Sequence, residues 1–305
     1  MRLVAALGGN ALLRPGEAPT VANQRARLEG AADGLARLAQ GNDLVITHGN
    51  GPQLGWLALQ AEALAGSAPV PLDVLDAETE GLLGYLIIET LQRRLPDRQI
   101  VALLTRIAVE RADPAFAHPV KPVGPHYSKT EATALAAARG WAFARTQTGS
   151  RRVVPSPEPL AVLERAAIAR LLDAGTVVIC AGGGGIPVAR DTQGHYAGVE
   201  AVIDKDLASA LLARELAADA LLLLTDVAAV QTGYGTPAAQ ALGRLDVASL
   251  RALDFEREFA AGSMRPKVEA ACRFVERGGK FAAIGRLEDA ILLAAGRAGT
   301  VIGAR

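Results

Sequence analysis

A lysine stands between two carboxylates in the stretch 201–213, AVIDKDLASALLA, where a short apolar run meets a helical pattern. Asp204 or Asp206 can cap that helix, because a carboxylate accepts hydrogen bonds from the free amides of a first turn. The other interpretation is chemical: Lys205, at a strand-to-helix junction, is aimed at a transferring phosphoryl group. The rest of the chain has to decide between a solvated cluster of charges and a catalytic one.

Lysine is scarce in this chain, which has 32 Lys and Arg residues together but only five lysines. Arginine is a wide planar fork, whereas lysine is a compact point charge that fits between phosphate oxygens. A retained lysine therefore indicates a site, although Lys280 begins a strand-like segment and is interpreted as an ordinary solvated cation. The five are Lys121, Lys129, Lys205, Lys267 and Lys280.

Three expected strands end in glycine-rich turns, which are GGN at 8–10, HGNGP at 48–52 and GGGGIP at 182–187. In open α/β sheets, ligands bind beyond the carboxyl ends of the strands. Glycine there lets backbone amides approach anionic oxygens, and a following helix N-terminus adds positive potential. Three such turns, together with the few lysines, favour a phosphate-binding site.

Several familiar phosphate-binding patterns are missing. The chain has no G-x-x-x-x-G-K-[ST] sequence, which argues against a P-loop enzyme. It has no combination of H-R-D with D-F-G, which argues against a protein kinase. The dinucleotide fingerprint G-x-G-x-x-G does not follow the first expected strand, so a dehydrogenase is disfavoured as well.

The composition predicts a globular protein with an aliphatic interior. The 305 residues are 50% hydrophobic, 21% charged and 4% aromatic, and the formal net charge is 0. A neutral chain argues against nucleic acid as the main partner, since phosphate backbones favour a basic surface. The apolar start is broken at Gly8 and Gly9, and no run of about 18 apolar residues predicts a membrane span. Cys180 and Cys272 sit in apolar patterns and are expected to be buried thiols of a reduced cytoplasm.

Strand-like and helical patterns alternate along most of the chain, which predicts an α/β fold with a mainly parallel sheet covered on both faces. Strands are expected at 2–7, 43–47, 99–104, 176–181, 220–224, 280–284 and 300–302. Helices are expected at 22–39, 53–64, 77–95, 158–174, 247–253, 264–277 and 287–295.

The alternation lapses between about 113 and 159, where almost half of the prolines of the chain are found. This stretch also contains a hairpin pattern, WAFARTQTGSRRVVP, at 141–155. We therefore expect one domain over 1–305 in which residues 113–157 form an inserted, protruding subdomain or lid.

An ordered set of motifs resembles the carbamate kinases, within the amino acid kinase family. The motifs are ALGGNAL (6–12), THGNGPQLG (47–55), KPVGP (121–125), VIDKDLAS (202–209) and GSMRPKVEA (262–270). The resemblance implies a three-layer α/β/α sandwich with an open, mainly parallel sheet of about eight strands and a small protruding subdomain. It also implies a cytoplasmic homodimer that converts ATP and carbamate to ADP and carbamoyl phosphate with Mg²⁺, and that is used for ATP synthesis in arginine catabolism.

Two alternatives stay open beside that resemblance. One is another enzyme of the same fold that phosphorylates a different carboxylate or phosphate. The other is a non-catalytic nucleotide sensor on the same scaffold.

Physical argument assigns roles to the charged residues of these motifs. Phosphoryl transfer needs positioning and charge neutralisation more than covalent chemistry. Lys205 and Lys267 are the expected holders of the transferring group, and Asp206 is expected to fix both ammonium groups, which would otherwise repel each other in an empty site. Asp204 is the expected helix cap.

The glycine-rich turns are expected to bind the two substrates, ATP and carbamate. Gly8, Gly9 and Asn10 are expected to offer amides to the β- and γ-phosphates of ATP. Carbamate, a small planar anion, is expected to lie in the turn GNG at 49–51, formed by Gly49, Asn50 and Gly51. His48 is not expected to act as a general base, because carbamate attacks as an oxygen nucleophile without losing a proton.

The resemblance also implies a lysine from the protruding subdomain, since many amino acid kinases carry one where this chain has Ala6. Lys121 matches that position, and Lys129 is the weaker substitute. Tyr234 and Met264 are expected near the nucleotide base. No cluster of histidines and carboxylates predicts a protein-held metal, so Mg²⁺ is expected to arrive with ATP/ADP.

Overall fold

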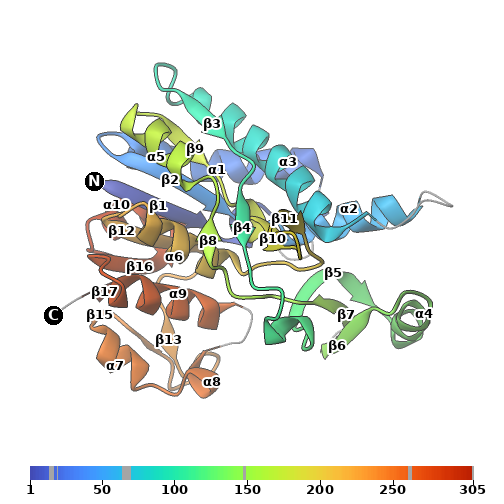
Figure 1. Ribbon diagram of the computed structural model, residues 1–305. Coiled ribbons are helices and arrows are strands. Elements are labelled where there is room, and N and C mark those ends of the chain that lie inside the picture. The colour runs from blue at the N-terminus through green and yellow to red at the C-terminus, as the bar shows by residue number, and fades with distance from the viewer. Residues whose placement is uncertain (14–16, 19, 64–69, 147–148, 260–262, 304–305) are drawn as a thin grey trace.

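The computed structural model describes residues 1–13, 17–18, 20–63, 70–146, 149–259 and 263–303. Within these ranges, an eight-stranded sheet with the order β15-β17-β16-β12-β1-β2-β9-β3 forms the centre of the molecule (Figure 1). Its strands are β1 (Arg2–Leu7), β2 (Asp43–His48), β3 (Ile100–Ala102), β9 (Val177–Ile179), β12 (Ala220–Thr225), β15 (Arg244–Leu245), β16 (Phe281–Arg286) and β17 (Thr300–Gly303).

Neighbouring strands of this sheet pair in parallel, apart from β16 and β17, which pair antiparallel. Strand β1 shows the reason, because every residue from Leu3 to Leu7 is buried and both of its faces are apolar. Such a strand has to be covered on both sides. The predicted mainly parallel sheet of about eight strands is confirmed.

Helices cover the two faces of the sheet and complete a three-layer α/β/α sandwich. Leu3 and Ala5 face a core shared with α1, α3 and α10, whereas Val4 and Ala6 face a core shared with α5, α6 and α9. Alternate residues of one strand thus pack into the cores on opposite faces of the sheet. The α-helices are α1 (Val21–Ala39), α2 (Gly51–Ala63), α3 (Leu72–Gln92), α4 (Lys129–Arg139), α5 (Arg165–Asp173), α6 (Lys205–Glu215), α7 (Val247–Arg251), α8 (Phe255–Glu258), α9 (Met264–Glu276) and α10 (Ala290–Ala294).

Smaller sheets flank the central one. Strands β11-β10-β4-β8 form one of them, and β13 pairs with β14. Strands β5-β7-β6 form a third, which extends with α4 from one end of the molecule (Figure 1); we call residues 121–146 and 149–154 the small-sheet unit. The bounds are β4 (Arg106–Ala108), β5 (Lys121–Tyr127), β6 (Ala142–Thr146), β7 (Gly149–Val154), β8 (Ala161–Val162), β10 (Ile186–Arg190), β11 (Tyr196–Gly198), β13 (Gln231–Thr232) and β14 (Gln240–Ala241).

The small-sheet unit is fastened to the main body by α2. Leu54 of α2 and Val202 pack in one buried cluster with Val123 of the unit. A Cβ at Gly55 would lie 2.2 Å from the Gly124 Cα, so the absence of a side chain allows the helix to touch the backbone of β5. The position of the unit therefore depends on α2, which begins at the second glycine-rich turn.

Three expectations about local structure were wrong. The helix expected over 77–95 already begins at Leu72 and ends at Gln92. The helix expected over 158–174 begins only at Arg165, because residues 161–162 form β8 and pair with β4. The apolar pair Val202 and Ile203 is not a strand before α6. The amide of Val202 instead donates to Pro155 O, which ties down the segment that leaves the small-sheet unit.

The remaining expectations concern surfaces and thiols. No helix in the described part of the chain is long and apolar enough to cross a membrane. Cys180 and Cys272 are both free and buried. Lys280 is largely exposed and forms an ion pair with Asp219.

Candidate active site

A cavity of about 710 Å³ lies at the carboxyl ends of β1, β2 and β12. Its lining includes Gly8 and Gly9 after β1, the turn 49–52 after β2, and the loop 225–227 after β12. This volume is within the range of roughly 300–1,000 Å³ that is typical of small-molecule sites. The cavity is where a doubly covered parallel sheet is expected to bind a ligand.

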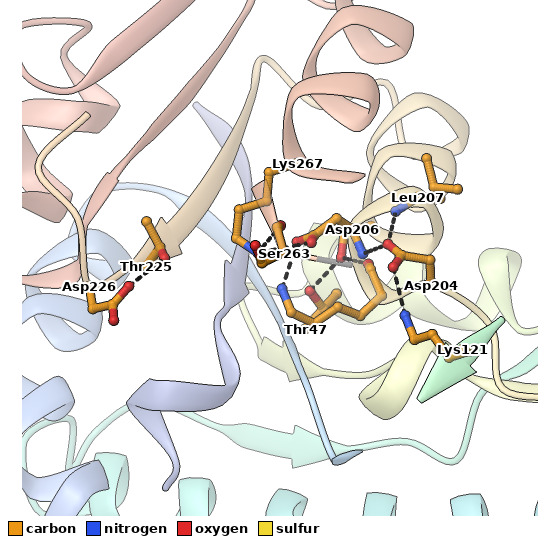
Figure 2. A network of polar contacts seen from close by, with 11 residues as sticks. Thr47, Lys121, Asp204, Asp206, Leu207, Thr225, Asp226, Ser263 and Lys267 are labelled. Atoms are coloured by element: carbon orange, nitrogen blue, oxygen red, sulfur yellow. Dashed lines mark hydrogen bonds and ion pairs between the residues drawn. The ribbon is translucent and has the colours of Figure 1, made fainter. Parts of the chain in front are cut away.

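Charged and polar side chains extend across the cavity. Figure 2 shows Lys267 and Asp206 in the middle, Lys121 on one side, and Thr225 with Asp226 on the other. We call the two sides the Lys121 end and the Thr225 end. All of these residues line the same cavity.

Helix α6 begins with the lysine between two carboxylates. Asp204 is its N-cap, and its Oδ1 accepts hydrogen bonds from the amides of Asp206 at 2.9 Å and Leu207 at 3.3 Å. Asp206 is in the first turn, where the helix dipole favours a negative charge. The N-cap expected at Asp204 is confirmed. The side chain of Asp206 does not cap the helix and is available to bind other side chains.

Asp206 connects two lysines that are 62 residues apart in the chain. Lys205 Nζ donates to its Oδ1 at 2.6 Å. Lys267 Nζ donates to its Oδ2 at 3.1 Å (Figure 2). Burial alone would raise the pKa of Asp206, but the two ammonium charges and their hydrogen bonds outweigh burial and lower this pKa to about 2. The carboxylate is therefore ionised and holds both lysines towards one cavity.

Two hydroxyl groups in series connect the backbone of Lys205 to β2. Ser209 Oγ donates to Lys205 O at 2.6 Å and lies 2.7 Å from Thr47 Oγ1 of β2. Burial lowers the pKa of the Lys205 ammonium, against the raising effect of Asp206 and with the lowering effect of Lys267. A desolvated ammonium beside a second one attracts a further anion strongly.

Lys121 reaches this helix terminus from the small-sheet unit. Its Nζ donates to Asp204 Oδ2 at 2.6 Å (Figure 2). Lys205 is therefore not held between its two neighbouring carboxylates, because Asp204 is taken by the helix cap and by Lys121. Lys129 is exposed and is not part of the cavity lining, so the geometry favours Lys121 over Lys129.

The first two glycine-rich turns approach the lysines closely, but two of their amides are already used. Gly8 N donates to Leu224 O at 2.9 Å, and Gly49 N donates to Leu7 O at 3.2 Å. The expectation that these two amides are offered to a ligand was wrong, because they continue the hydrogen bonding of the parallel sheet. Their lack of a side chain still matters: a Cβ at Gly49 would lie 3.3 Å from the Lys205 Cδ.

Gly9 and Gly51 retain the expected position for amide donors. Gly9 begins the short 3₁₀ helix Gly9–Ala11, and Gly51 begins α2. Amides in a first turn have no intrahelical acceptor. Both residues line the cavity. The side chain of Asn10 lies outside the described residues.

The side chain of Asn50 is fixed by α3. Its Nδ2 donates to Asp76 Oδ1 at 2.6 Å and to Thr79 Oγ1 at 2.7 Å. Burial raises the pKa of Asp76 well above its ordinary value, while the hydrogen bond from Asn50 opposes that shift. A Cβ at Gly183 would lie 2.2 Å from Asn50 Nδ2, so the third glycine-rich turn packs against this amide.

His48 lies beneath the same turn. Its ring is buried, and a Cβ at Gly182 would lie 2.4 Å from its Cε1. Burial lowers the pKa of His48 to about 4, and the Lys205 charge lowers it too, against the raising effect of a hydrogen bond with Gly49. His48 is therefore neutral and tightly packed.

Tyr234 and Met264 line the cavity, together with Gln231. The Tyr234 side chain is 70% exposed, and Met264 is partly buried at the start of α9. Both are placed where they can contact a ligand that extends from the lysines towards β13.

Sequence reasoning missed Asp76, Thr79 and Arg151. Asp76 and Thr79 lie on the buried stripe of α3 with Leu72, Leu75 and Leu83. A polar pair at helical spacing inside an apolar stripe was the signal that could have revealed them. Arg151 lines the cavity from β7 but gave no such signal, since the chain is rich in arginine.

The carboxylates around the lysines are already engaged by protein groups. Asp206 binds two lysines, and Asp204 binds Lys121 and the helix amides. Among the residues that the structure describes, no group of three or more histidines, cysteines and carboxylates could hold a metal ion. The donor set suits a cation that arrives on the phosphates of a nucleotide, because Mg²⁺ keeps water and phosphate oxygens as ligands.

Comparisons with known proteins agree with this geometry. A model of the amino acid kinase family matches residues 1–285. Carbamate kinase of Haemophilus influenzae is 48% identical over 303 residues, which cover 99% of this chain and 96% of that protein. Carbamate kinase of Pyrococcus horikoshii is 43% identical over 310 residues, which cover 99% of this chain and 98% of that protein.

A solved structure gives the same result in three dimensions. Carbamate kinase from Giardia lamblia, bound to AMP-PNP, superposes with a TM-score of 0.91 at 39% sequence identity. The match covers 99% of this chain and 98% of that one.

Proposed function

The chain belongs to the amino acid kinase family, and from that premise we propose that it catalyses the reaction for which its relatives are named, phosphoryl transfer between ATP and carbamate. The products are ADP and carbamoyl phosphate. The observation that carries the proposal is the pair of lysines, Lys205 and Lys267, held by one buried carboxylate, Asp206, in the cavity.

The chemistry follows from where the positive charges lie. A carboxylate oxygen of carbamate attacks the γ-phosphorus, and the bond to the β,γ-bridging oxygen breaks to release ADP. Negative charge spreads over the phosphoryl oxygens in the transition state. Lys205 and Lys267 are the donors that neutralise this charge, and they need no reorganisation because Asp206 holds both beforehand.

The acceptor is assigned to the Lys121 end. Gly51 offers a first-turn amide of α2, and Asn50 is fixed by Asp76 and Thr79. Lys121 completes the site when it exchanges Asp204 for the transferring group. Residues 113–157 then act as a lid, with the small-sheet unit as its folded part.

The nucleotide is assigned to the Thr225 end. Gly8 and Gly9 lie close to the β- and γ-phosphates, with Asn10 beside them, and Tyr234 and Met264 flank the base. Mg²⁺ bound to the nucleotide phosphates neutralises their charge. The engagement of Asp204 and Asp206 by protein donors supports a metal held mainly by phosphates and water.

Three wider statements belong to the same proposal. The protein works as a homodimer, in the cytoplasm, where two free and buried thiols are stable. It serves ATP synthesis at the end of arginine catabolism. Size-exclusion chromatography with light scattering tests the dimer.

The decisive experiment supplies carbamoyl phosphate and MgADP and measures ATP. Formation of ATP is expected, and its absence would sink the proposal. Coupled ADP assays with carbamate, acetylglutamate, aspartate and isopentenyl phosphate separate carbamate from the acceptors of other enzymes with this fold. Absence of ADP from every substrate would favour a non-catalytic nucleotide sensor.

A further inference from the structure

We infer that Arg151 binds an oxyanion group of the acceptor, either carbamate or the carbamoyl phosphate made from it, and this inference rests on the proposed function. Arg151 lies on β7 and lines the same cavity as Lys121 and Lys205. None of the five sequence motifs includes it.

The guanidinium of Arg151 is oriented by an irregular point in the small sheet. The pairing of β5 with β7 shifts register between Val123 and His126, and Gly124 within this bulge has a φ of +69°. Gly124 O accepts a hydrogen bond from Arg151 Nη2 at 3.0 Å. The bulge thus supplies a fixed acceptor that holds one nitrogen of the fork in place.

The charge of Arg151 has no protein counter-charge in the described part of the chain. No carboxylate there pairs with it, and its Nε is buried without a hydrogen-bond partner. Burial lowers the pKa of this guanidinium, and no neighbouring carboxylate opposes that shift. A partly buried charge without a counter-charge is poorly compensated, and an anion that enters the cavity supplies the missing partner.

The position of Arg151 favours the acceptor over the nucleotide. The small-sheet unit contributes Lys121, Pro122, Val123 and Arg151 to the cavity lining, and Lys121 marks the side opposite Thr225 and Asp226 (Figure 2). A guanidinium is a planar fork that matches a carboxylate or a phosphate with two parallel hydrogen bonds. Carbamate offers the first group and carbamoyl phosphate the second.

Arg152 is a matched control on the same strand. Successive side chains of a strand point to opposite faces. The Arg152 guanidinium lies 3.9 Å from the centre of the Trp141 ring, outside the lining of the main cavity. Arg152→Gln thus removes the same charge from the same strand without touching the site.

The test measures the binding of a stable analogue. Phosphonoacetamide, in which a methylene replaces the bridging oxygen of carbamoyl phosphate, is titrated calorimetrically into the full chain with MgADP present. Arg151→Gln is expected to weaken its binding by about tenfold or more, as for the loss of a hydrogen bond to a charged group. Arg152→Gln is expected to bind it like the wild-type protein.

Steady-state kinetics provide the second readout. In Arg151→Gln the KM for carbamoyl phosphate should rise by a similar factor, while the KM for MgADP stays within about twofold. Equal behaviour of the Arg151 and Arg152 variants would overturn the inference, as would equal rises of both KM values. The proposed function fails separately: it fails if the wild-type protein makes no ATP, whereas Arg151 keeps its assignment if it still governs binding of the analogue.

Discussion

Lys121 Nζ lies 2.6 Å from Asp204 Oδ2, so a lysine of the small-sheet unit is paired with the residue that caps α6. The other oxygen, Oδ1, accepts from the amides of Asp206 and Leu207. Because the two oxygens have separate partners, Lys121 can leave Asp204 without removing the cap. The helix that carries Lys205 therefore keeps its first turn when the lysine of the unit moves.

Substitutions at Asp204 should distinguish its role as the cap of α6 from its ion pair with Lys121. Asparagine caps helices about as well as aspartate, so Asp204→Asn should remain close to the wild-type free energy of unfolding. Asp204→Ala loses the cap and should be less stable than Asp204→Asn by about 0.5–2 kcal/mol. Urea denaturation measures both variants, and equal losses would show that the cap contributes nothing.

Lys121→Ala should lower kcat, because the variant lacks one charge on the transferring group. We expect a fall on the order of 10- to 100-fold, with the free energy of unfolding nearly unchanged. Lys129→Ala is the matched control, since Lys129 is exposed on the same unit. Unchanged turnover in Lys121→Ala would refute both the role of this lysine and the lid.

Asp206→Asn should have a large effect on kcat and should also lower the free energy of unfolding, because two buried ammonium groups lose their counter-charge. The amide has nearly the same shape but carries no charge to hold Lys205 and Lys267 together, so kcat should fall on the order of 10²–10³-fold. Asp219→Asn, at a carboxylate paired with Lys280 away from the cavity, is the control. A kcat that differs little between the two variants contradicts the organising role.

His48 should titrate well below the usual range of a histidine. Its pKa is lowered to about 4 in the folded state by burial, against about 6.5 in the unfolded chain. The unfolded state therefore binds a proton that the folded state does not bind. The contribution of His48 to the free energy of unfolding is fully present above pH 6.5 and falls as the pH drops towards 4. This loss amounts to roughly 3 kcal/mol. NMR titration of the imidazole signals tests the value, with His48→Gln to assign the signal; a midpoint near 6.5 would contradict it.

Thr79→Val should weaken binding of the acceptor and leave binding of the nucleotide unchanged. The valine removes one of the two groups that hold Asn50 Nδ2. The loss of one hydrogen bond corresponds to about 0.5–1.5 kcal/mol of binding free energy, so the KM for carbamoyl phosphate should rise several-fold. The KM for MgADP should stay constant. Thr90→Val on the same helix is the control, since Thr90 Oγ1 donates only to Leu86 O. Equal KM changes in the two variants would leave Thr79 without a role at the site.

The sequence was sufficient for the main sheet and for the central lysines. The apolar runs of β1, β2 and β12 are local patterns, and each ends at the turn or loop that lines the cavity. Lys205 and Asp206 are neighbours in the chain, so their pairing was visible to local reasoning.

Contacts between distant segments were not predictable in the same way. Lys121 and Asp204 are separated by 83 positions, and nothing near either residue specifies the other. The amides of Gly8 and Gly49 looked available because the hydrogen bonds that use them come from neighbouring strands. Asp76 was missed because the helix expected over 77–95 left it out, and its partner Asn50 lies on another element.

Gly55 has a consequence for how the two sides of the acceptor site communicate. Helix α2 begins at Gly51, in the acceptor turn, and touches Gly124 of the small-sheet unit through Gly55. Gly124 in turn holds Arg151, so one short helix spans the distance from the turn to the arginine. Thermodynamic linkage makes this coupling reciprocal. If the placement of the unit changes the affinity for the acceptor by some factor, then binding of the acceptor changes the equilibrium placement of the unit by the same factor.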